Sequence, residues 1–427
     1  MRRALYVLLS TVVFALLSPV LLLARKTRAG FLERFGLYPP GKIPQGGWPR
    51  VWLHGASAGD LQALAPMISR FRERFPDCRV VLSTITDTGH LMATERLREQ
   101  VDALVYAPWD VPWAARRAVA ALRPDLLVLE YAEIWPNLIR AVRRSGGRVV
   151  LTNGRLSPKR LGGYRTLFTL FGNPLAELDL LLMREDDEAE RALALGAPLD
   201  RVWVTGNTKF DGLTGPAPST EDETVRTALG LPRGAPVLIG GSTHEGEEET
   251  LLAVWERLRT QHPDLRLVLA PRYVDRAARV LALAQARGAR ASRRSQGPPG
   301  APVMVLDTIG ELARAYRMAT VVFVGGSFTS RGGQNILEPA AQGKPVLFGP
   351  RMENFRDSVQ VLLGRGGIQV ADAEQLYRVL SELLARPEVV EDLGQLALQS
   401  VRQVSGASQR NVDLVSRLLL GAGPRRA

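Results

Sequence analysis

The sequence predicts an α/β protein with two doubly wound domains, because short apolar segments alternate with helical ones in two successive rounds along its 427 residues. In the first round, apolar runs bounded by turn residues are typical of buried parallel strands: 50–54, 79–83, 103–107, 126–130, 148–152, 180–183 and 202–206. The second round repeats the pattern at 236–241, 265–270, 302–306, 321–326, 345–349 and 367–370. Helical stretches separate many of these strands, among them 60–75, 111–122, 134–144 and 186–195.

Composition is that of a globular protein and excludes several classes of site. Hydrophobic residues make up 46% and charged residues 23%, so disordered and fibrous proteins are excluded. The single cysteine, Cys78, rules out a disulfide framework and a zinc site built on several thiolates. The four histidines never stand four residues apart, so we expect no dedicated metal site.

The chain is strongly basic, with a formal net charge of +12. Only five of its 55 basic residues are lysines, an arginine bias that codon usage alone could produce. The surplus also suits an anionic membrane, anionic substrates or nucleic acid. Because no RNA-binding signature or tandem basic stripe is present, we expect no nucleic-acid partner.

Residues 4–24 carry no charge, and at 1.5 Å per residue they span about 31 Å, the thickness of a bilayer core. A cleaved signal peptide is one alternative, but no small-x-small site closes the apolar run. A helix lying in the interface or docked on the protein is another, because polar residues and Pro19 interrupt the stretch. We expect an uncleaved membrane anchor over 1–28 and a cytoplasmic remainder, which the single cysteine favours.

The predicted domains are 29–212 and 213–427. An alternative for the last helix is that it packs back on the first domain. A polar stretch at 211–223 is typical of a linker, and 291–301 is expected to be a surface loop. Two such domains facing a cleft would place ligands at the carboxyl ends of the strands.

In the second half, the strongest candidate site is the run 323–339, FVGGSFTSRGGQNILEP. Glycines after a strand let the backbone approach a ligand, and a helix opening near Asn335 would offer free N–H groups to an anion. Glu338, one turn into that helix, could accept bonds from two vicinal hydroxyls of a ribose. The alternative is that the glycines only make turns and Glu338 only caps the helix.

Two further segments end strands at the same predicted edge. Arg272 follows the strand 265–270, where a guanidinium is well suited to bidentate phosphate binding. Ser242 and Thr243 follow another strand and could cap the next helix, with two glutamates in its first turn. His244 stands between them, and its role is left open.

In the first half, two carboxylates are candidate general bases. Asp60 is the last residue of the segment HGASAGD. The alternative to a general base is that its charge only stabilises the first turn of a helix. Glu33 lies among aromatics in GFLERFG, where burial would raise its pKa, or else forms a surface pair with Arg34. A third segment, 130–137, carries a proline expected to start a helix.

These segments together resemble the transferases of 3-deoxy-D-manno-octulosonic acid (Kdo), which add that sugar acid to a lipid A precursor. The resemblance covers nearly the whole chain and rests on ordered motifs: LERFG at 32–36, HGASAGD at 54–60, WPN at 135–137, NGRLS at 153–157, TGNTKFD at 205–211, GSTHEGEE at 241–248, APR at 270–272, DTIGEL at 307–312, FVGGS at 323–327 and GGQNILEP at 332–339. It implies the B-type glycosyltransferase fold, CMP-Kdo as donor, inversion at the anomeric carbon and no metal or cofactor. It further implies a lipid A precursor and membrane lipids as partners, at the cytoplasmic face of the inner membrane.

The resemblance also implies site residues. The CMP site would comprise residues of three segments: Pro271, Arg272, Ile309, Gly310, Glu311, Asn335, Ile336, Leu337 and Glu338. Asp60 and Glu33 would be the candidate proton acceptors, both on the acceptor side. The sugar would be bound by Lys209, as a counter-charge to its carboxylate, and by Ser242, Thr243 and His244.

Three positions depart from the family pattern. Asp60 replaces a glutamate, Tyr131 replaces the first glutamate of E-T-E-L-W-P-N, and Gln334 replaces the histidine of G-G-H-N. A diverged relative with another CMP-activated ulosonic acid or another acceptor is therefore an alternative. A sugar-nucleotide epimerase of the same architecture and a membrane-bound scaffold without activity are two more.

Overall fold

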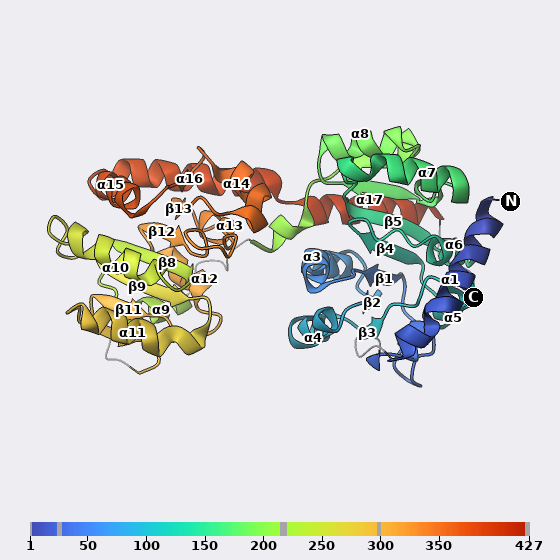
Figure 1. Cartoon of the computed structure of the whole chain (residues 1–427), viewed down its shortest axis with the longest axis horizontal. Helices are drawn as coiled ribbons and strands as arrows, with labels where there is room; N and C mark the ends of the chain where they lie inside the picture. The colour runs from blue at the N-terminus through green and yellow to red at the C-terminus, as the bar shows by residue number, and fades with distance from the viewer. Residues whose placement is uncertain (1, 24–27, 214–219, 297–299, 423–427) are drawn as a thin grey trace. The chain divides into compact units, whose positions relative to one another are not determined.

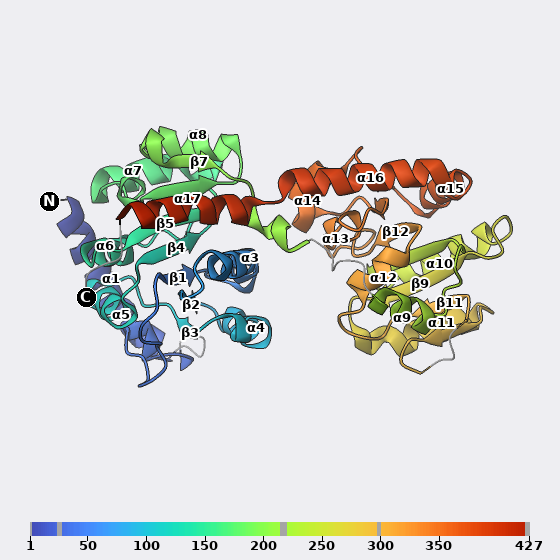
Figure 2. The ribbon, with the colours of Figure 1, turned by 180° about the vertical axis from the view of Figure 1, so that it is seen from behind.

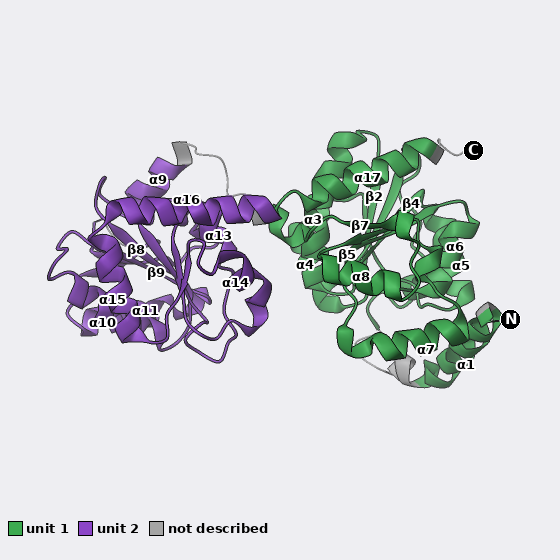
Figure 3. Cartoon of the chain, turned by 90° about the horizontal axis from the view of Figure 1, so that it is seen from above, with its two compact units in different colours: residues 1–212, 405–427 green, residues 213–404 purple. Residues whose placement is uncertain are grey.

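The computed structural model describes residues 2–23, 28–213, 220–296 and 300–422. The chain divides into two compact units, Met1–Gly212 with Ser405–Ala427 and Leu213–Val404 (Figure 1, Figure 3). Each unit is built on a sheet of seven parallel strands. The α/β class predicted from the alternation is confirmed in both halves.

The first unit's sheet has the order β3-β2-β1-β4-β5-β6-β7. Its strands are β1 (Arg50–His54), β2 (Arg79–Thr84), β3 (Ala103–Tyr106), β4 (Leu126–Glu130), β5 (Arg148–Gly154), β6 (Leu180–Met183) and β7 (Val202–Val204). All five residues of β4 are buried, as expected for a strand covered on both faces. Because every pair is parallel, all the carboxyl ends lie at one edge of this sheet.

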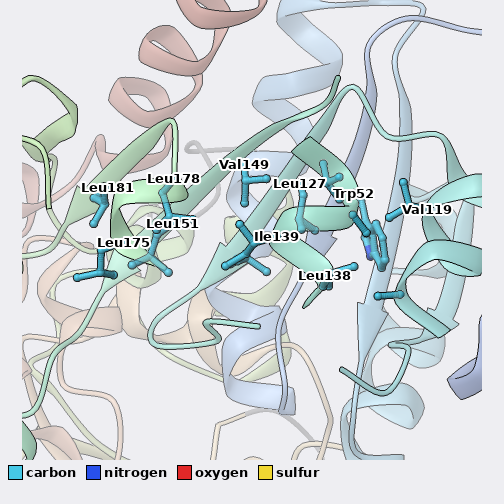
Figure 4. Packing of buried hydrophobic residues seen from close by; sticks show 14 of the residues in the cluster. Trp52, Val119, Leu127, Leu138, Ile139, Val149, Leu151, Leu175, Leu178 and Leu181 are labelled. Carbon is cyan, nitrogen blue, oxygen red and sulfur yellow. The ribbon is translucent and has the colours of Figure 1, made fainter. Parts of the chain in front are cut away.

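Helices cover both faces of this sheet. They are α3 (Ala58–Arg74), α4 (Asp87–Arg96), α5 (Pro112–Leu122), α6 (Pro136–Arg144), α7 (Leu161–Phe171), α8 (Asp186–Ala194) and α17 (Ala407–Ala422). One apolar cluster joins α3, α4 and α17 to one face of the sheet, and another joins α5 and α6 to the opposite face. Figure 4 shows the second cluster, in which Ile139 and Leu138 of α6 lie beside Leu127, Val149 and Trp52. Pro112 and Pro136 start their helices, as proline at a first helical position does.

The N-terminal helix α1 (Arg2–Leu23) is docked on the first unit. The Tyr6 hydroxyl donates to the Asp110 carboxylate at 2.8 Å, and the Asn137 amide donates to the Ser10 hydroxyl at 3.2 Å. The Phe14 ring lies about 6 Å from three aromatic rings: those of Phe35, Trp109 and Trp113. Over the residues described, we find no helix with the length and apolarity needed to cross a bilayer. The predicted membrane-spanning anchor is thus not supported.

The second unit's sheet has the order β10-β11-β9-β8-β12-β13-β14. Its strands are β8 (Val237–Thr243), β9 (Arg266–Pro271), β10 (Ala291–Arg293), β11 (Val303–Val305), β12 (Val321–Val324), β13 (Val346–Phe348) and β14 (Gly367–Gln369). The expected surface loop at 291–301 was wrong in its first part, because β10 pairs there with β11 at the sheet edge. An edge strand of three residues with only Ser292 buried has no apolar run to reveal it.

The helices of this unit are α9 (Thr220–Ala228), α10 (Glu247–Leu258), α11 (Ala277–Ala286), α12 (Leu312–Met318), α13 (Leu337–Ala340), α14 (Arg356–Leu362), α15 (Ala373–Leu384) and α16 (Pro387–Val404). Part of the predicted linker, 214–219, lies outside the described residues. Its last residues, 220–223, are the first turn of α9 and were wrongly predicted as linker. Acidic and hydroxyl residues favour both loops and helix starts, so composition alone did not separate the two.

The last helix, α17, belongs to the first unit although α16 before it belongs to the second. Figure 2 shows α17 along β5, and it also packs on α3. The Asp211 carboxylate accepts the first free N–H groups of α17, from Gly406, Ala407 and Ser408. Arg410 adds a bond of 2.9 Å to the Thr205 carbonyl.

Candidate active site

In the second unit, one buried carboxylate holds the glycine-rich segment that follows β12. The two oxygens of Glu247 accept backbone N–H bonds of 2.7–3.0 Å from four residues: His244, Gly326, Ser327 and Phe328. A Cβ atom at Gly325 would lie 2.7 Å from this carboxylate, so only glycine fits there. Burial raises the pKa of Glu247, and the four N–H bonds oppose that shift. Glu247 therefore shapes the loop from the first turn of α10.

The residues at the end of β8 have different surroundings. Ser242 lies at a register shift of the sheet, with a left-handed φ of 52° that L-residues rarely adopt. Thr243 is fully buried, and its hydroxyl donates to Glu248 at 2.9 Å. Glu248 also binds Arg276 with two bonds of 2.8 and 3.2 Å. The Thr243 side chain therefore supports the loop from within and does not face solvent.

Positive charge gathers around His244. Burial lowers the pKa of its imidazole, and Arg331, Arg276 and Arg272 lower that pKa further. Arg272 and Arg331 are exposed, so both guanidinium groups are accessible to an anion. The Gln334 amide nitrogen lies 3.4 Å from His244 Nε2. Arg331 was not predicted as a site residue, although it lies between two glycine-rich turns.

Glu338 is a half-buried carboxylate at the same edge. Burial raises its pKa, while a hydrogen bond from Asn335 and the charge of Arg272 lower it. The Asn335 amide donates to Glu338 at 3.2 Å and accepts the Leu337 N–H at 3.1 Å. The helix begins at Leu337, later than expected, and is a single turn. The side chains of Ile336 and Leu337 are buried, so these two residues can offer a ligand only their backbone.

The loop before α12 completes this edge. Ile309 is 90% exposed, and Gly310 has a φ of 89°, which favours glycine. Arg294 donates to Glu311 at 3.0 Å, and Thr308 also donates to this carboxylate. Pro271 ends β9, which lies between β11 and β8. The predicted donor-site segments thus follow neighbouring strands of one sheet.

In the first unit, His54 and Glu133 form a pair that the sequence did not predict. His54 is buried at the end of β1, with Nδ1 2.9 Å from the Ser83 hydroxyl. Its Nε2 lies 3.7 Å from the Glu133 carboxylate, which accepts a bond of 2.9 Å from the Trp135 indole. Both residues stand inside conspicuous motifs, HGASAGD and EIWPN, and only the fold brings those motifs together.

Asp60 lies at the same end of β1, where a Cβ atom at Gly55 would be 2.8 Å from the Asp60 Cβ. One of its oxygens accepts the Ser57 N–H at 2.8 Å in a capping box of α3, which is the ordinary helix role weighed from the sequence. The charge of Asp60 contributes to raising the pKa of Glu130, whose complete burial is the main cause. Asn153 links Glu130 to Thr208 through hydrogen bonds of 2.5 and 2.6 Å. Asp60 is therefore one member of a cluster of carboxylates at the ends of β1 and β4.

Glu33 lies in a different cluster, at the end of the outer strand β3. It is 8% exposed, and its oxygens accept bonds from the Lys42 ammonium and from the Tyr106 N–H at 2.9 Å. The alternative of a surface pair with Arg34 is wrong, because Arg34 is 1% exposed and donates to the Ile85 carbonyl at 2.8 Å. The two candidate bases thus share a sheet edge but have separate surroundings.

Lys209 lies in the 3₁₀ helix Thr208–Leu213, where its side chain is exposed and its N–H donates to Asn207 at 3.0 Å. Tyr131, one of the departures from the family pattern, has a left-handed φ of 54° directly after β4. Across the described residues, no group of three or more histidine, cysteine, aspartate or glutamate side chains is arranged to hold a metal ion.

Comparison with known proteins decides the family. Residues 29–212 match the model of a family described as 3-deoxy-D-manno-octulosonic-acid transferase. A 3-deoxy-D-manno-octulosonic acid transferase of Bordetella pertussis is 33% identical over 377 residues, which cover 85% of this chain and 86% of the relative. The chain belongs to the Kdo transferase family. A Haemophilus influenzae relative of the same name is 30% identical over 91% of both chains.

The resemblance found in the sequence is thereby confirmed, and this Kdo transferase family member is a glycosyltransferase. Among solved structures, UDP-GlcNAc 2-epimerase from Neisseria meningitidis covers 86% of this chain and 100% of its own, with a TM-score of 0.60 and 14% identity. At that identity the likeness shows the fold alone. It agrees with the α/β B-type glycosyltransferase fold that the motifs implied.

Proposed function

We propose that this protein transfers Kdo from CMP-Kdo to a lipid A precursor in lipopolysaccharide synthesis, with inversion and without a metal. The observation that carries the proposal is the cationic edge of the second unit, where Arg272 and Arg331 are accessible beside His244. Close by, the charge of Arg272 acts on the half-buried carboxylate of Glu338. A nucleoside monophosphate offers a phosphate to the arginines and ribose hydroxyls to the carboxylate.

The cytosine of the donor would lie against the loop of Ile309 and Gly310. The Ile309 side chain is exposed, and Gly310 has a left-handed φ, so the loop allows close approach of a ligand. The CMP phosphate would be bound by Arg272, with backbone N–H groups near Asn335. Negative charge grows on this phosphate as the glycosidic bond to Kdo breaks, so cationic donors that are already in place lower the barrier. Lys209 would neutralise the carboxylate of Kdo.

A carboxylate must remove the proton from the acceptor's sugar hydroxyl as its oxygen attacks the anomeric carbon. Asp60 and Glu33 are the candidates in the first unit. Asp60 holds a backbone N–H with one oxygen, while both oxygens of Glu33 are engaged by Lys42 and the Tyr106 N–H. The pair of His54 and Glu133, at the ends of β1 and β4, is a further group that could accept the proton.

We also propose that the protein works at the cytoplasmic face of the inner membrane. Its acceptor is a lipid, and the docked helix α1 exposes apolar side chains, with Leu8 62% and Leu16 73% accessible. A helix that lies on the protein with an apolar side outward suits an interfacial position. This replaces the spanning anchor as the proposed mode of membrane association.

The first experiment measures CMP release by purified, detergent-solubilised protein supplied with CMP-Kdo, with and without a lipid A precursor. Release that depends on the lipid is expected. Binding of CMP without release would mean that the donor site is intact but the sugar or the acceptor differs, for which Gln334 beside His244 is the residue to examine first. Absence of CMP binding would contradict the donor assignment.

A further inference from the structure

The first unit contains a cationic cavity that the proposed reaction does not use. It has a volume of about 640 Å³ and lies between α1 and the helices α5 and α6. Val7 and Leu8 of α1 form an apolar wall, while Arg116, Arg140 and Arg144 line the other side. None of the residues that line it is acidic, although Arg140 pairs with Glu177 outside the lining.

Arg140 is the buried member of these three arginines. Its side chain is only 8% exposed, and its Nε donates to Glu177 at 3.2 Å. Its Nη1 is buried without a hydrogen-bond acceptor among the described residues. A buried guanidinium N–H without an acceptor is unfavourable, and a negative charge in the cavity would stabilise the guanidinium through space. Arg116 and Arg144 are exposed. The Nε of Arg116 donates to the Pro112 carbonyl at 3.0 Å, and the outer ends of both guanidinium groups are accessible to the same anion.

The helix beside the cavity carries an apolar ridge. Large exposed side chains follow one side of α1: Leu5, Leu8, Leu9, Val12 and Leu16. Leu8 belongs both to this ridge and to the cavity wall. On the other side of α1 a second hollow of about 430 Å³ is mostly apolar, with Leu167 and Phe171 of α7 among its lining. A contiguous apolar surface next to a cationic cavity matches an amphiphile with a negative head.

We infer that the cavity binds the phosphate of an anionic bilayer phospholipid, whose acyl chains lie along the ridge of α1. A free phosphate would use the arginines but leave the ridge uncovered. A zwitterionic lipid such as phosphatidylcholine would offer its phosphate without the net negative charge that three arginines favour. The inference rests on the proposed function only in placing the protein at a membrane. The site is separate from the carboxylates at the strand ends and from the donor site in the second unit.

The test is cosedimentation of the full chain with vesicles of phosphatidylcholine alone or mixed with phosphatidylglycerol. The double variant Arg116→Gln/Arg144→Gln should lose about tenfold in affinity for the anionic vesicles and little for the neutral ones. The matched control is Arg74→Gln/Arg96→Gln, which removes the same charge from exposed positions on α3 and α4, on the opposite face of the sheet. The control should bind like the parent.

Two results would overturn the inference. Equal loss in the test and control variants would mean that only net charge matters. Inorganic phosphate that stabilises the parent in thermal unfolding, but not the Arg116→Gln/Arg144→Gln variant, would identify a site for soluble phosphate instead. Because vesicle binding needs no donor or acceptor, failure here is distinguishable from failure of Kdo transfer, which CMP release in detergent measures.

Discussion

At the residue scale, burial decides which carboxylates shape the protein and which remain able to bind a ligand. Glu247 and Glu338 both have a pKa raised by burial, yet their partners differ. Glu247 accepts four backbone N–H groups, whereas Glu338 accepts the side-chain amide of Asn335. A half-buried carboxylate with spare acceptor capacity is suited to ribose hydroxyls.

We therefore predict that Glu338→Ala weakens CMP binding about tenfold to a hundredfold, since hydrogen bonds to a charged group contribute about 1.5–3 kcal/mol. Isothermal titration calorimetry with CMP measures the change. The control is Glu388→Ala, which removes an exposed glutamate in the first turn of α16. Parental affinity in Glu338→Ala would remove this residue from the donor site.

For the proton acceptor, we predict that Glu33→Gln and Asp60→Asn differ in turnover and leave donor affinity nearly unchanged. Loss of a general base lowers kcat about 10²- to 10⁴-fold. The variant of the true base should show this loss, measured as initial rates of CMP release at saturating donor. Asp60→Asn also weakens the capping box of α3, so its thermal unfolding serves as the control for stability. Near-parental turnover excludes the residue concerned.

At the scale of elements, the loop after β12 depends on a side chain from α10. We predict that Glu247→Ala lowers the free energy of unfolding by about 3 kcal/mol or more, because several buried N–H groups lose their acceptor at about 1–3 kcal/mol each. Urea denaturation measures this. Glu249→Ala, an exposed glutamate in the same helical turn, is the control and should change little. Equal small effects in both variants would contradict this role of Glu247.

The elements themselves were largely predictable from the sequence. Buried parallel strands are continuous apolar runs, so β1, β4 and β6 agree with their predicted ranges residue for residue. The short edge strand β10 was not predicted, because its residues Ala291, Ser292 and Arg293 do not form an apolar run. The docking of α1 was only an alternative to the membrane anchor, since it depends on Tyr6 and Asp110, which are far apart in sequence. Local patterns do not report such pairings.

The candidate site was predictable in part for the same reason. Motif residues such as Arg272 and Glu338 stand directly after strands, so their placement at a sheet edge followed from the topology. The pair of His54 and Glu133 was not predicted because it joins the ends of two strands with about 75 residues between them along the chain. The inward orientation of Thr243 was also not predicted, since a hydroxyl residue after a strand is equally typical of a helix cap and of a ligand-binding group.

At the scale of the whole molecule, two units with separate cores should unfold as separate transitions. We predict that CMP raises the temperature of only one transition in calorimetry, because a ligand stabilises the unit that holds its site. The shift should disappear in Glu338→Ala, which assigns that transition to residues 213–404. If CMP raised the temperature of both transitions, or still raised one of them in Glu338→Ala, the nucleotide would bind elsewhere.

The return of α17 to the first unit has a consequence for how the chain is made. The second unit is an insertion, because residues 213–404 lie between two parts of one discontinuous unit. On the ribosome, the inserted unit has all its residues available before the first unit does. Val412, Val415 and Leu419 of α17 belong to the first unit's core, so that core is finished only when the final helix leaves the exit tunnel. A premature stop codon near the end would therefore damage the half of the protein that was synthesised first.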